Sequence, residues 1–409
     1  MDDLVSLVEK ASTLRRAAES PSEADYQIRD RLMQTPEFRE IHESIGALLR
    51  QDSTFVEREG IIALHGAWIR FNADLTAHWL AIRATTVSAE QACLDLERFL
   101  NQSDFPYVVR IAVSGIFIEK DMQFGEGLWL RTDRQEHLPK ALHPNEFLSR
   151  SLLHMPMVAL IEERVQKIQR RPAEERDKSE LRQPPLESDD VLLCLSLVRP
   201  PATPFIVGLV CEPAKWVPMY GFLDVPRTLE SSGHQTRLWR DHTQRAQMMY
   251  DAFRVLPPRR KARLRLPMSR LNTAMRRRED ADTAIDLGIA LEGLVIGSSE
   301  TDKRYQAAVR CAFLLGNDVE SRHRAYHLAG ELYHLRNRAV HRGVITQDDL
   351  TPHFKGKEVR RVLEEGASLV ATVITRLIEN NAQEPDWNSL VLGEYTKPLT
   401  SQGEPEPGV

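Results

Sequence analysis

The chain has few cysteines and no long run of apolar residues. Its four cysteines are Cys93, Cys194, Cys211 and Cys311, and no two of them form a C-x-x-C pair. This wide spacing indicates reduced, mostly buried thiols in a reducing compartment rather than a disulfide framework. The longest apolar runs, such as Val191–Val198, have the length of a strand and are too short to cross a bilayer.

The sequence also lacks an excess of positive charge and a recognisable targeting segment. The net charge of −5 means that any contact with nucleic acid must be local rather than a property of the whole surface. The first residues, Met-Asp-Asp-Leu-Val, do not have the pattern of a signal peptide. The length of 409 residues and the charged fraction of 28% are typical of a globular protein with two or three domains. We therefore expect a soluble, cytoplasmic protein without a membrane partner.

The first hundred residues carry apolar side chains mainly at helical spacing. Pro36 can break the second of four predicted helices, which cover residues 3–19, 23–50, 55–83 and 88–101. Ser88, followed three residues later by Gln91, is a capping-box pattern at the start of the last helix. The tryptophan and phenylalanine residues of this region are assigned to the core, with a ligand box as the alternative. Residues 1–104 are thus predicted to form a helical domain.

From Phe105 the spacing changes to one that favours strands. Residues 106–119 are rich in Val, Ile, Tyr and Phe and predict a strand bent at Gly115, and residues 128–131 predict a returning strand. Further predicted elements are a helix over 147–170, a charged, Pro-rich loop over 171–188, and a hairpin of strands over 190–198 and 204–211. We expect residues 105–255 to form a mixed α+β domain. It contains no Gly-rich phosphate loop and no nucleophile elbow.

Two charged features of the middle region have competing interpretations. Asp189 and Asp190 are interpreted as a solvated strand end rather than a metal site. Nine basic residues crowd residues 257–278, among them Arg276 and Arg277. They favour either a surface that follows nucleic-acid phosphates or a solvated face balanced by the nearby acidic residues. Those acidic residues are Glu279, Asp280 and Asp282.

The C-terminal part predicts four helices joined by short connections. They cover residues 280–296, 301–316, 318–340 and 355–380. Helices of this length and order make a bundle, which we place at residues 265–390. A docked turn at 385–387 and a flexible tail over 391–409 complete the chain. The predicted fold class is therefore α+β and mostly helical, with a C-terminal four-helix bundle.

The third of these helices carries an arginine on its apolar face. Arg336 falls in the middle of a face formed by Ala325, Leu328, Ala329, Leu332, Tyr333, Ala339 and Val340. A guanidinium keeps its charge, so it needs an acidic or phosphate partner or an opening to water. Glu292 falls in the centre of the apolar face predicted for the first helix, which is formed by Ala281, Ala284, Ile285, Gly288, Ile289, Val295 and Ile296. The sequence therefore predicts a contact between Glu292 and Arg336, with an edge position for Glu292 as the alternative.

The same helix ends in residues suited to work on a phosphodiester. His341 follows Arg336 by five positions, and Gly343 can end the helix in a left-handed cap. A guanidinium offers paired contacts to phosphate oxygens, and a histidine that titrates near neutrality can carry protons. The alternative is a zinc site that uses His323 and His327, which are four residues apart. The stripe of histidines continues through His334 to His341.

The motif and the helix order resemble a known family. Arg336-Asn-x-x-x-His341 ends the third helix of a four-helix unit, Leu-Gly-Ile-Ala-Leu-Glu lies in the first helix, and Gly343 follows the motif. Residues 265–390 resemble the HEPN superfamily, and within it the Apea-like group of bacterial defence proteins. The resemblance implies a metal-independent endoribonuclease without a cofactor, in which two copies of the chain form one composite active site.

The resemblance also implies roles for individual residues. Arg336 would hold the scissile phosphate, His341 would transfer protons, Asn337 would orient the site, and Glu292 would position Arg336. Candidate RNA contacts are Arg338, Arg342, His334, Arg276 and Arg277. The expected partner is an RNA substrate, with tRNA as one candidate, and the expected activator is a phage or host component. The alternative hypothesis is a non-catalytic HEPN module that binds RNA, nucleotide or a partner protein.

Overall fold

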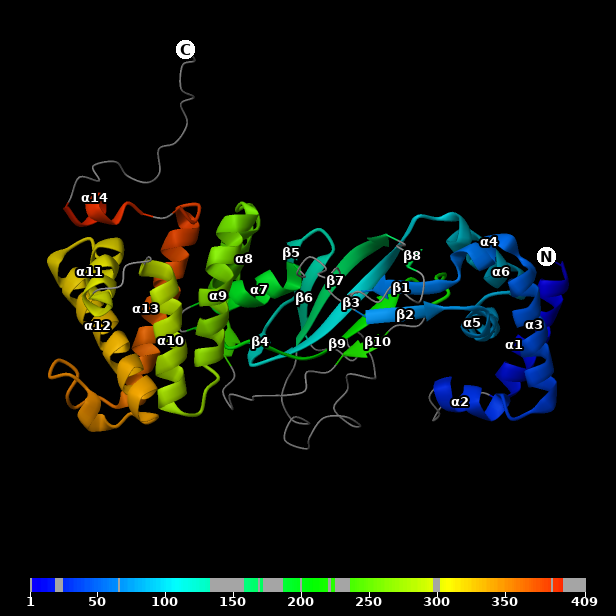
Figure 1. Ribbon diagram of the computed structural model, residues 1–409, viewed down its shortest axis with the longest axis horizontal. Helices are drawn as coiled ribbons and strands as arrows, with labels where there is room; N and C mark the ends of the chain where they lie inside the picture. Colours follow the sequence, from blue (N-terminus) through cyan, green and yellow to red (C-terminus); the bar gives the residue numbers. More distant parts are fainter. Residues whose placement is uncertain are drawn as a thin grey trace, which may run out of the picture. The chain divides into compact units, whose positions relative to one another are not determined.

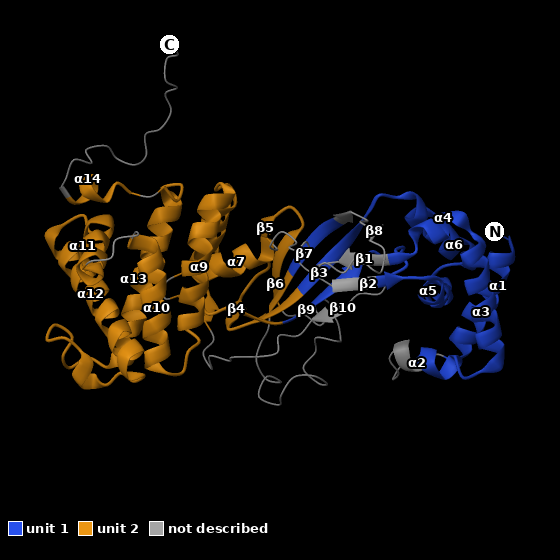
Figure 2. Cartoon of the chain, in the orientation of Figure 1, with its two compact units in different colours: residues 1–110, 161–185, 208–225 blue, residues 111–160, 186–207, 226–409 orange. Residues whose placement is uncertain are grey.

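The protein is α+β and mostly helical, as the sequence predicts. The computed structural model describes residues 2–18, 25–64, 67–132, 158–167, 170–171, 187–198, 201–219, 222–224, 236–296, 302–383 and 385–392. The chain divides into two compact units (Figure 2). Unit 1 comprises residues 1–110, 161–185 and 208–225, and unit 2 comprises residues 111–160, 186–207 and 226–409. The predicted boundaries at 104 and 255 do not coincide with this division, since each unit takes segments from the middle region.

Unit 1 contains the N-terminal helices and a short hairpin. The helices are α1 (Asp2–Ala18), α2 (Asp25–Leu32), α3 (Pro36–Gln51), α4 (Ser53–Arg58), α5 (Ala73–Thr86) and α6 (Ala89–Asn101). Helix α5 packs against α1, α3 and α6. Four buried phenylalanines form a row of ring contacts in the core. The ring centroids are 5.0 Å apart for Phe55 and Phe71, 5.2 Å for Phe71 and Phe99, and 6.1 Å for Phe99 and Phe105. The aromatic residue Phe71 is thus part of the core, as predicted.

The predicted helix over 55–83 is wrong in its first half. Residues Gly60–Leu64 and Ala67–Phe71 are the antiparallel strands β1 and β2, and only α5 is helical. The run Ile61–Leu64 is four consecutive apolar residues, a pattern that fits a strand and a buried helix equally. The start of α6 is as predicted, because the backbone N–H of Gln91 donates to Ser88 Oγ at 3.0 Å.

The strands of the described chain form three sheets. The orders are β2-β1-β8, β10-β9-β3-β7-β6-β5, and a parallel pair β11-β4. The remaining strands are β3 (Asp104–Ser114), β4 (Ile116–Ile118), β5 (Met122–Gly125), β6 (Leu128–Thr132), β7 (Val158–Lys167), β8 (Arg170–Arg171), β9 (Phe205–Pro213), β10 (Phe222–Asp224) and β11 (Thr236–Leu238). The predicted bend falls at Gly115, whose φ of 84° separates β3 from β4. A side chain at this position would also collide with the carbonyl of Thr203.

Two predicted elements of the middle region are wrong. Val158–Lys167 is strand β7, although Glu, Leu and Ala in this segment favour a helix, and residues 147–157 lie outside the described chain. Residues Glu187–Leu195 form helix α7 instead of a strand, so the predicted hairpin with 204–211 does not exist. The sequence feature that favours a helix here is the acidic first turn of α7, because negative charges stabilise the positive end of the helix dipole. Of the predicted loop over 171–188, residues 172–186 lie outside the description.

Unit 2 contains the C-terminal helices (Figure 1). They are α8 (Arg240–Arg254), α9 (Pro258–Ala274), α10 (Asp280–Val295), α11 (Lys303–Leu315), α12 (Val319–Arg342), α13 (Val359–Glu379) and α14 (Trp387–Leu392), with a 3₁₀ helix at Gln347–Asp349. Each of α10, α11, α12 and α13 packs against the other three, so the predicted four-helix bundle is present. Helix α9 also packs against α10 and α13. None of the described helices is long and apolar enough to cross a membrane.

The buried faces of these helices differ in part from the predicted ones. In α10, Leu287, Leu291 and Leu294 are fully buried, whereas Ile285 and Ile289 are only half-buried. The periodicity is blurred because α9 covers a further side of this helix. Tyr305 of α11 lies at helical spacing from the buried Ala308 and Ala312, which predicts an inward side chain, but it is 61% exposed.

The ends of the bundle agree better with the sequence. Asp318 caps α12 by accepting from the backbone N–H of Ser321 at 2.8 Å, and Gly343 ends the helix with a left-handed φ of 74°. Most of the apolar face of α12 is buried up to Ala339, but Leu328 is half-buried and Val340 is 51% exposed. The predicted docked turn is the short helix α14, where Trp387 is buried beneath the guanidinium of Arg310. The predicted flexible tail lies almost entirely outside the described residues.

Gly366→Ala should lower the free energy of unfolding by about 1–3 kcal/mol, because its new methyl group overlaps Leu332 where α13 meets α12. Gly293→Ala is the matched control. Its methyl group would lie 3.5 Å from Pro267, an ordinary contact, and alanine is favoured over glycine in a helix by about 0.5–1 kcal/mol. Urea unfolding followed by circular dichroism measures both variants, and equal stability would contradict the close approach of the two helices.

Candidate functional site

Arg336 lies on α12 with its side chain against α10. Gly288 makes room for it, since a side chain there would overlap the Cβ and Cγ atoms of Arg336. The Arg336 Nη2 donates to Glu292 Oε2 at 3.4 Å, and Nη1 donates to Asn337 Oδ1 at 3.0 Å. The predicted contact between Glu292 and Arg336 is therefore confirmed. The guanidinium also lies 5.6 Å from the ring centroid of Tyr333, a buried residue as expected.

Lys303 is a component of this site that the sequence analysis missed. Its Nζ donates to Glu292 Oε1 at 2.6 Å, so each oxygen of one carboxylate faces a different cation. The hydrogen bond to Glu292 and its negative charge raise the pKa of Lys303. The side chains of Glu292, Arg336 and Lys303 are 24%, 26% and 37% exposed, so all three reach solvent. The only signal in the sequence is a cation at the start of a helix, where the helix dipole disfavours it.

His341 lies apart from this group of charges. It is exposed in the last turn of α12, and it makes no hydrogen bond or ion pair within the described chain. Residues five positions apart on a helix project about 140° from one another around its axis, at 3.6 residues per turn. One copy of the chain therefore does not turn Arg336 and His341 toward the same point. Val340 and Val344, on either side of His341 in the sequence, are 51% and 61% exposed.

Arg338 and Arg342 converge on a second carboxylate, Asp349. Arg342 Nη1 lies 3.1 Å from Asp349 Oδ1, and Arg338 Nε lies 3.7 Å from the same atom. The backbone N–H and the hydroxyl of Thr346 donate to the other oxygen at 2.9 and 3.0 Å. The Thr346 hydrogen bonds, and then the two arginines, lower the pKa of Asp349. Asp349 is buried, but both arginines remain in contact with solvent.

The segment that contains Asp349 runs back along α12. His334 Nε2 hydrogen-bonds to the backbone carbonyl of Asp349 at 3.0 Å, which requires a proton on this ring nitrogen. Glu331, which is buried, accepts from the backbone N–H of Thr351 at 3.0 Å and from its hydroxyl at 2.5 Å. His334, a candidate RNA contact, is thus half-buried and already engaged by this segment.

The histidine stripe does not form a metal site. The ring centroids of His323 and His327 are 6.0 Å apart, and His327 stacks on His353 at 4.1 Å. Burial, and then the two neighbouring rings, lower the pKa of His327. Among the residues that the structure describes, no group of three or more His, Cys, Asp or Glu side chains could hold a metal ion.

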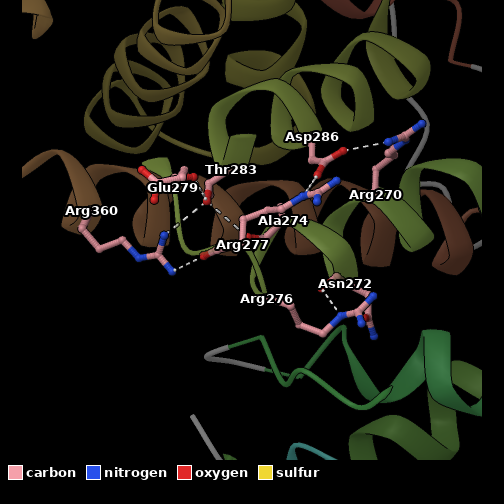
Figure 3. Close-up of polar contacts among 9 residues, drawn as sticks. All are labelled: Arg270, Asn272, Ala274, Arg276, Arg277, Glu279, Thr283, Asp286 and Arg360. Atoms are coloured by element: carbon pink, nitrogen blue, oxygen red, sulfur yellow. Dashed lines mark hydrogen bonds and ion pairs between the residues drawn. The ribbon is translucent and has the colours of Figure 1, made fainter. Parts of the chain in front are cut away.

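The basic stretch of residues 257–278 is tied to two buried carboxylates. Asp286 accepts from Arg270 Nη1 at 2.8 Å and from Arg277 Nε at 2.9 Å (Figure 3). Asp190 makes a paired contact with Arg265 at 2.9 and 3.0 Å, so the interpretation of Asp190 as a solvated strand end is wrong. Two of the compensating acids thus come from other parts of the chain, and Asp280, one of the acids next to the stretch, pairs with Arg360 of α13 at 3.3 Å.

The two predicted RNA contacts in this stretch have different surroundings. Arg277 binds Asp286, and its backbone carbonyl accepts from Arg360 Nη2 at 3.1 Å. Arg276 Nε donates to the carbonyl of Asn272 at 3.4 Å (Figure 3). Its guanidinium lies 5.9 Å from the ring centroid of Phe205. Arg277 therefore links the end of α9 to α10 and α13, whereas Arg276 contacts α9 and β9.

Comparison of the chain with family models, with curated proteins and with solved structures gives no match. The resemblance to HEPN domains stays a prediction. It rests on the motif of α12 and on the contact that this motif makes with α10.

Asp286→Ala should lower the free energy of unfolding by about 1–3 kcal/mol, because two half-exposed arginines lose the carboxylate that they share. Asp282→Ala removes an exposed carboxylate from the same helix and should change stability by less than about 0.5 kcal/mol. Unfolding is measured in urea, because urea is uncharged and, unlike guanidinium chloride, does not screen the ion pairs. Equal losses in the two variants would mean that Asp286 does not hold the basic stretch.

Asp349→Asn should make the free energy of unfolding less dependent on pH in the acidic range. A carboxyl group whose folded pKa is lowered adds stability above its unfolded pKa of about 3.9, and this stability is lost as pH falls through the folded value. Wild-type stability should therefore fall more steeply than that of the variant below about pH 4. Urea midpoints measured from pH 6 to pH 2.5 check this, with the exposed Asp348→Asn as the control. Parallel curves for all three proteins would contradict it.

Proposed function

We propose that residues 265–390 form a HEPN-type endoribonuclease that cleaves RNA without a metal ion. The observation that supports it most is the arginine of the motif, which a carboxylate of another helix holds at the bundle surface, with a glycine beneath its side chain. Such an arrangement keeps a permanent charge in place and exposed, as phosphate recognition requires. Asn337 fixes one edge of the guanidinium, which leaves the position of Arg336 well defined.

The proposed reaction uses the RNA's own 2′-hydroxyl as the nucleophile. His341 accepts the proton of this hydroxyl or returns one to the departing 5′-oxygen, a contribution of about 10²–10⁴-fold. Arg336 stabilises the negative charge that develops on the phosphorus oxygens. The 2′-oxygen bonds to phosphorus while the bond to the 5′-oxygen breaks. The products are a 2′,3′-cyclic phosphate and a 5′-hydroxyl, and DNA is resistant because it lacks the nucleophile.

A site made by two copies of the chain fits the position of His341. Arg336 and His341 of one helix project in different directions, so a second copy can supply the missing group. The exposed Val340 and Val344 beside His341 are suited to such a contact, since apolar side chains gain by leaving water. Arg338 and Arg342 lie on the same helix end and can contact neighbouring phosphates.

The regulation that we propose follows from the resemblance. A nuclease that attacks cellular RNA must be restrained until it is needed, and the N-terminal part of the chain is the candidate for this task. The protein would then act as a toxin-like effector in defence against phage. The alternative, a non-catalytic binding module, has support in the structure as well, because Glu292 and Asn337 already occupy the guanidinium of Arg336.

Purified full-length protein, incubated with total tRNA and a structured RNA in EDTA, should produce fragments with cyclic phosphate ends. Arg336→Ala and His341→Ala should each reduce the rate by at least about 10²-fold, because each removes a group that acts in the transition state. Arg324→Ala and His323→Ala change the same residue types at exposed positions of the same helix and should keep the wild-type rate.

Two results would overturn the proposal. Cleavage that requires a divalent ion would contradict the mechanism. RNA that remains intact with wild-type protein but is bound in a manner that depends on Arg336 would favour the binding module.

A further inference from the structure

We propose that Lys303 is a second phosphate-binding residue, which Glu292 holds beside Arg336. This inference rests on the proposed function and adds a residue that lies outside the motif. Glu292 of α10, Lys303 of α11 and Arg336 of α12 meet at one point, where three helices contribute two positive charges and one negative charge. The cluster therefore keeps one net positive charge, which a phosphodiester anion would neutralise.

Three other carboxylates in the described part of this unit are shared by two cations, namely Asp286, Asp349 and Glu365. Glu365 is 36% exposed, but its arginine, Arg361, is a neighbour four positions away on the same helix, whereas Glu292 brings together cations from two other helices. Asp286 and Asp349 differ from Glu292 in burial. The side chains of Asp286 and Asp349 are 3% and 7% exposed, so their arginines enclose them. Glu292 is 24% exposed, and both of its cations reach solvent as well. A ligand from solution can therefore reach the Glu292 cluster directly. The Asp286 and Asp349 carboxylates are closed to solvent, although the arginines that bind them are 29–54% exposed.

The contacts within the cluster are unequal. Lys303 Nζ lies 2.6 Å from the carboxylate, and Arg336 Nη2 lies 3.4 Å from it, a long hydrogen bond for charged groups. The contact of Glu292 with Arg336 is thus the weaker of the two, so Nη2 can exchange it for a phosphate oxygen while Asn337 keeps the guanidinium in place. Lys303 supplies a compact charge that any phosphate oxygen can approach. The two cations are complementary, because one sets the geometry and the other adds attraction.

The position of Lys303 in its helix strengthens the local positive charge. It is the first residue of α11, whose first turn has no acidic residue and whose capping position makes no side-chain hydrogen bond. A cation at this end of a helix is opposed by the helix dipole, and the contact with Glu292 offsets this. Arg304, the next residue, donates to the carbonyl of Gly330 and thus faces the packing with α12. Lys303 is the member of this pair that points toward Arg336.

The test measures binding of a fluorescent single-stranded RNA to the full-length protein in EDTA over a range of salt concentrations. Lys303→Gln should weaken binding and should reduce the slope of log affinity against log salt by about 0.7, the loss of one phosphate contact. Lys303→Arg should retain most of the affinity. Lys357→Gln is the matched control, since Lys357 is 41% exposed and pairs with Glu365 at 2.9 Å in the same bundle. It should leave both the affinity and the slope unchanged.

Melting temperatures establish that each variant is folded, and cleavage assays are run on the same samples. Equal changes in slope for Lys303→Gln and Lys357→Gln would overturn the role of Lys303, and cleavage by the wild-type protein would still support the nuclease. Conversely, a slope that changes only in Lys303→Gln, together with no cleavage by wild type, would support the phosphate site and overturn the nuclease. A single-stranded DNA of the same sequence should bind with the same dependence on Lys303, because the contact is to phosphate. Binding of RNA but not of DNA would contradict the proposed contact of Lys303 with phosphate.

Discussion

The contact between Glu292 and Arg336 is the constraint on which the proposed site depends. Neither charge is easily kept between two packed helices, since removal from water costs each of them several kcal/mol unless a partner is present. The pairing is possible only because Gly288 lets the arginine stem lie against α10. The positions of α10 and α12 are thus linked to the position of a reactive group. A change in the packing of these helices would change the chemistry at the surface.

The sequence predicted the bundle and this contact for a physical reason. Arg336 and Glu292 each interrupt a run of apolar residues at helical spacing, and two such interruptions satisfy one another. Lys303 could not be predicted in the same way, because it lies at a helix start where no periodic face identifies its neighbours. The role of Asp349 could not be predicted from the sequence either. Its partners Arg338 and Arg342 come from a helix that has already ended, and only the return of the chain brings them together.

The middle region shows why local pattern has limits. The segment Val158–Lys167 has residues that favour a helix, but it pairs as a strand, since neighbouring strands supply hydrogen bonds that propensity does not describe. Glu187–Leu195 shows the reverse, because its run of Val and Leu residues is typical of a strand. Its acidic first turn and the pairing of Asp190 with Arg265 favour the helix. In the bundle the faces of α10 were also partly misassigned, since a fifth helix packs there.

The return of the chain along α12 has a consequence for motion. The last turn of a helix usually frays, because its final carbonyl groups lack partners within the helix. Here Gly343 closes the turn with a hydrogen bond of 2.8 Å to Ala339, and Asp349 holds two arginines of the same turns. The backbone that carries His341 is therefore anchored on both sides, and its amide hydrogens should exchange with solvent slowly for a helix end. An exposed histidine on a rigid support can meet a substrate in one orientation, without the loss of entropy that ordering a loose end would require.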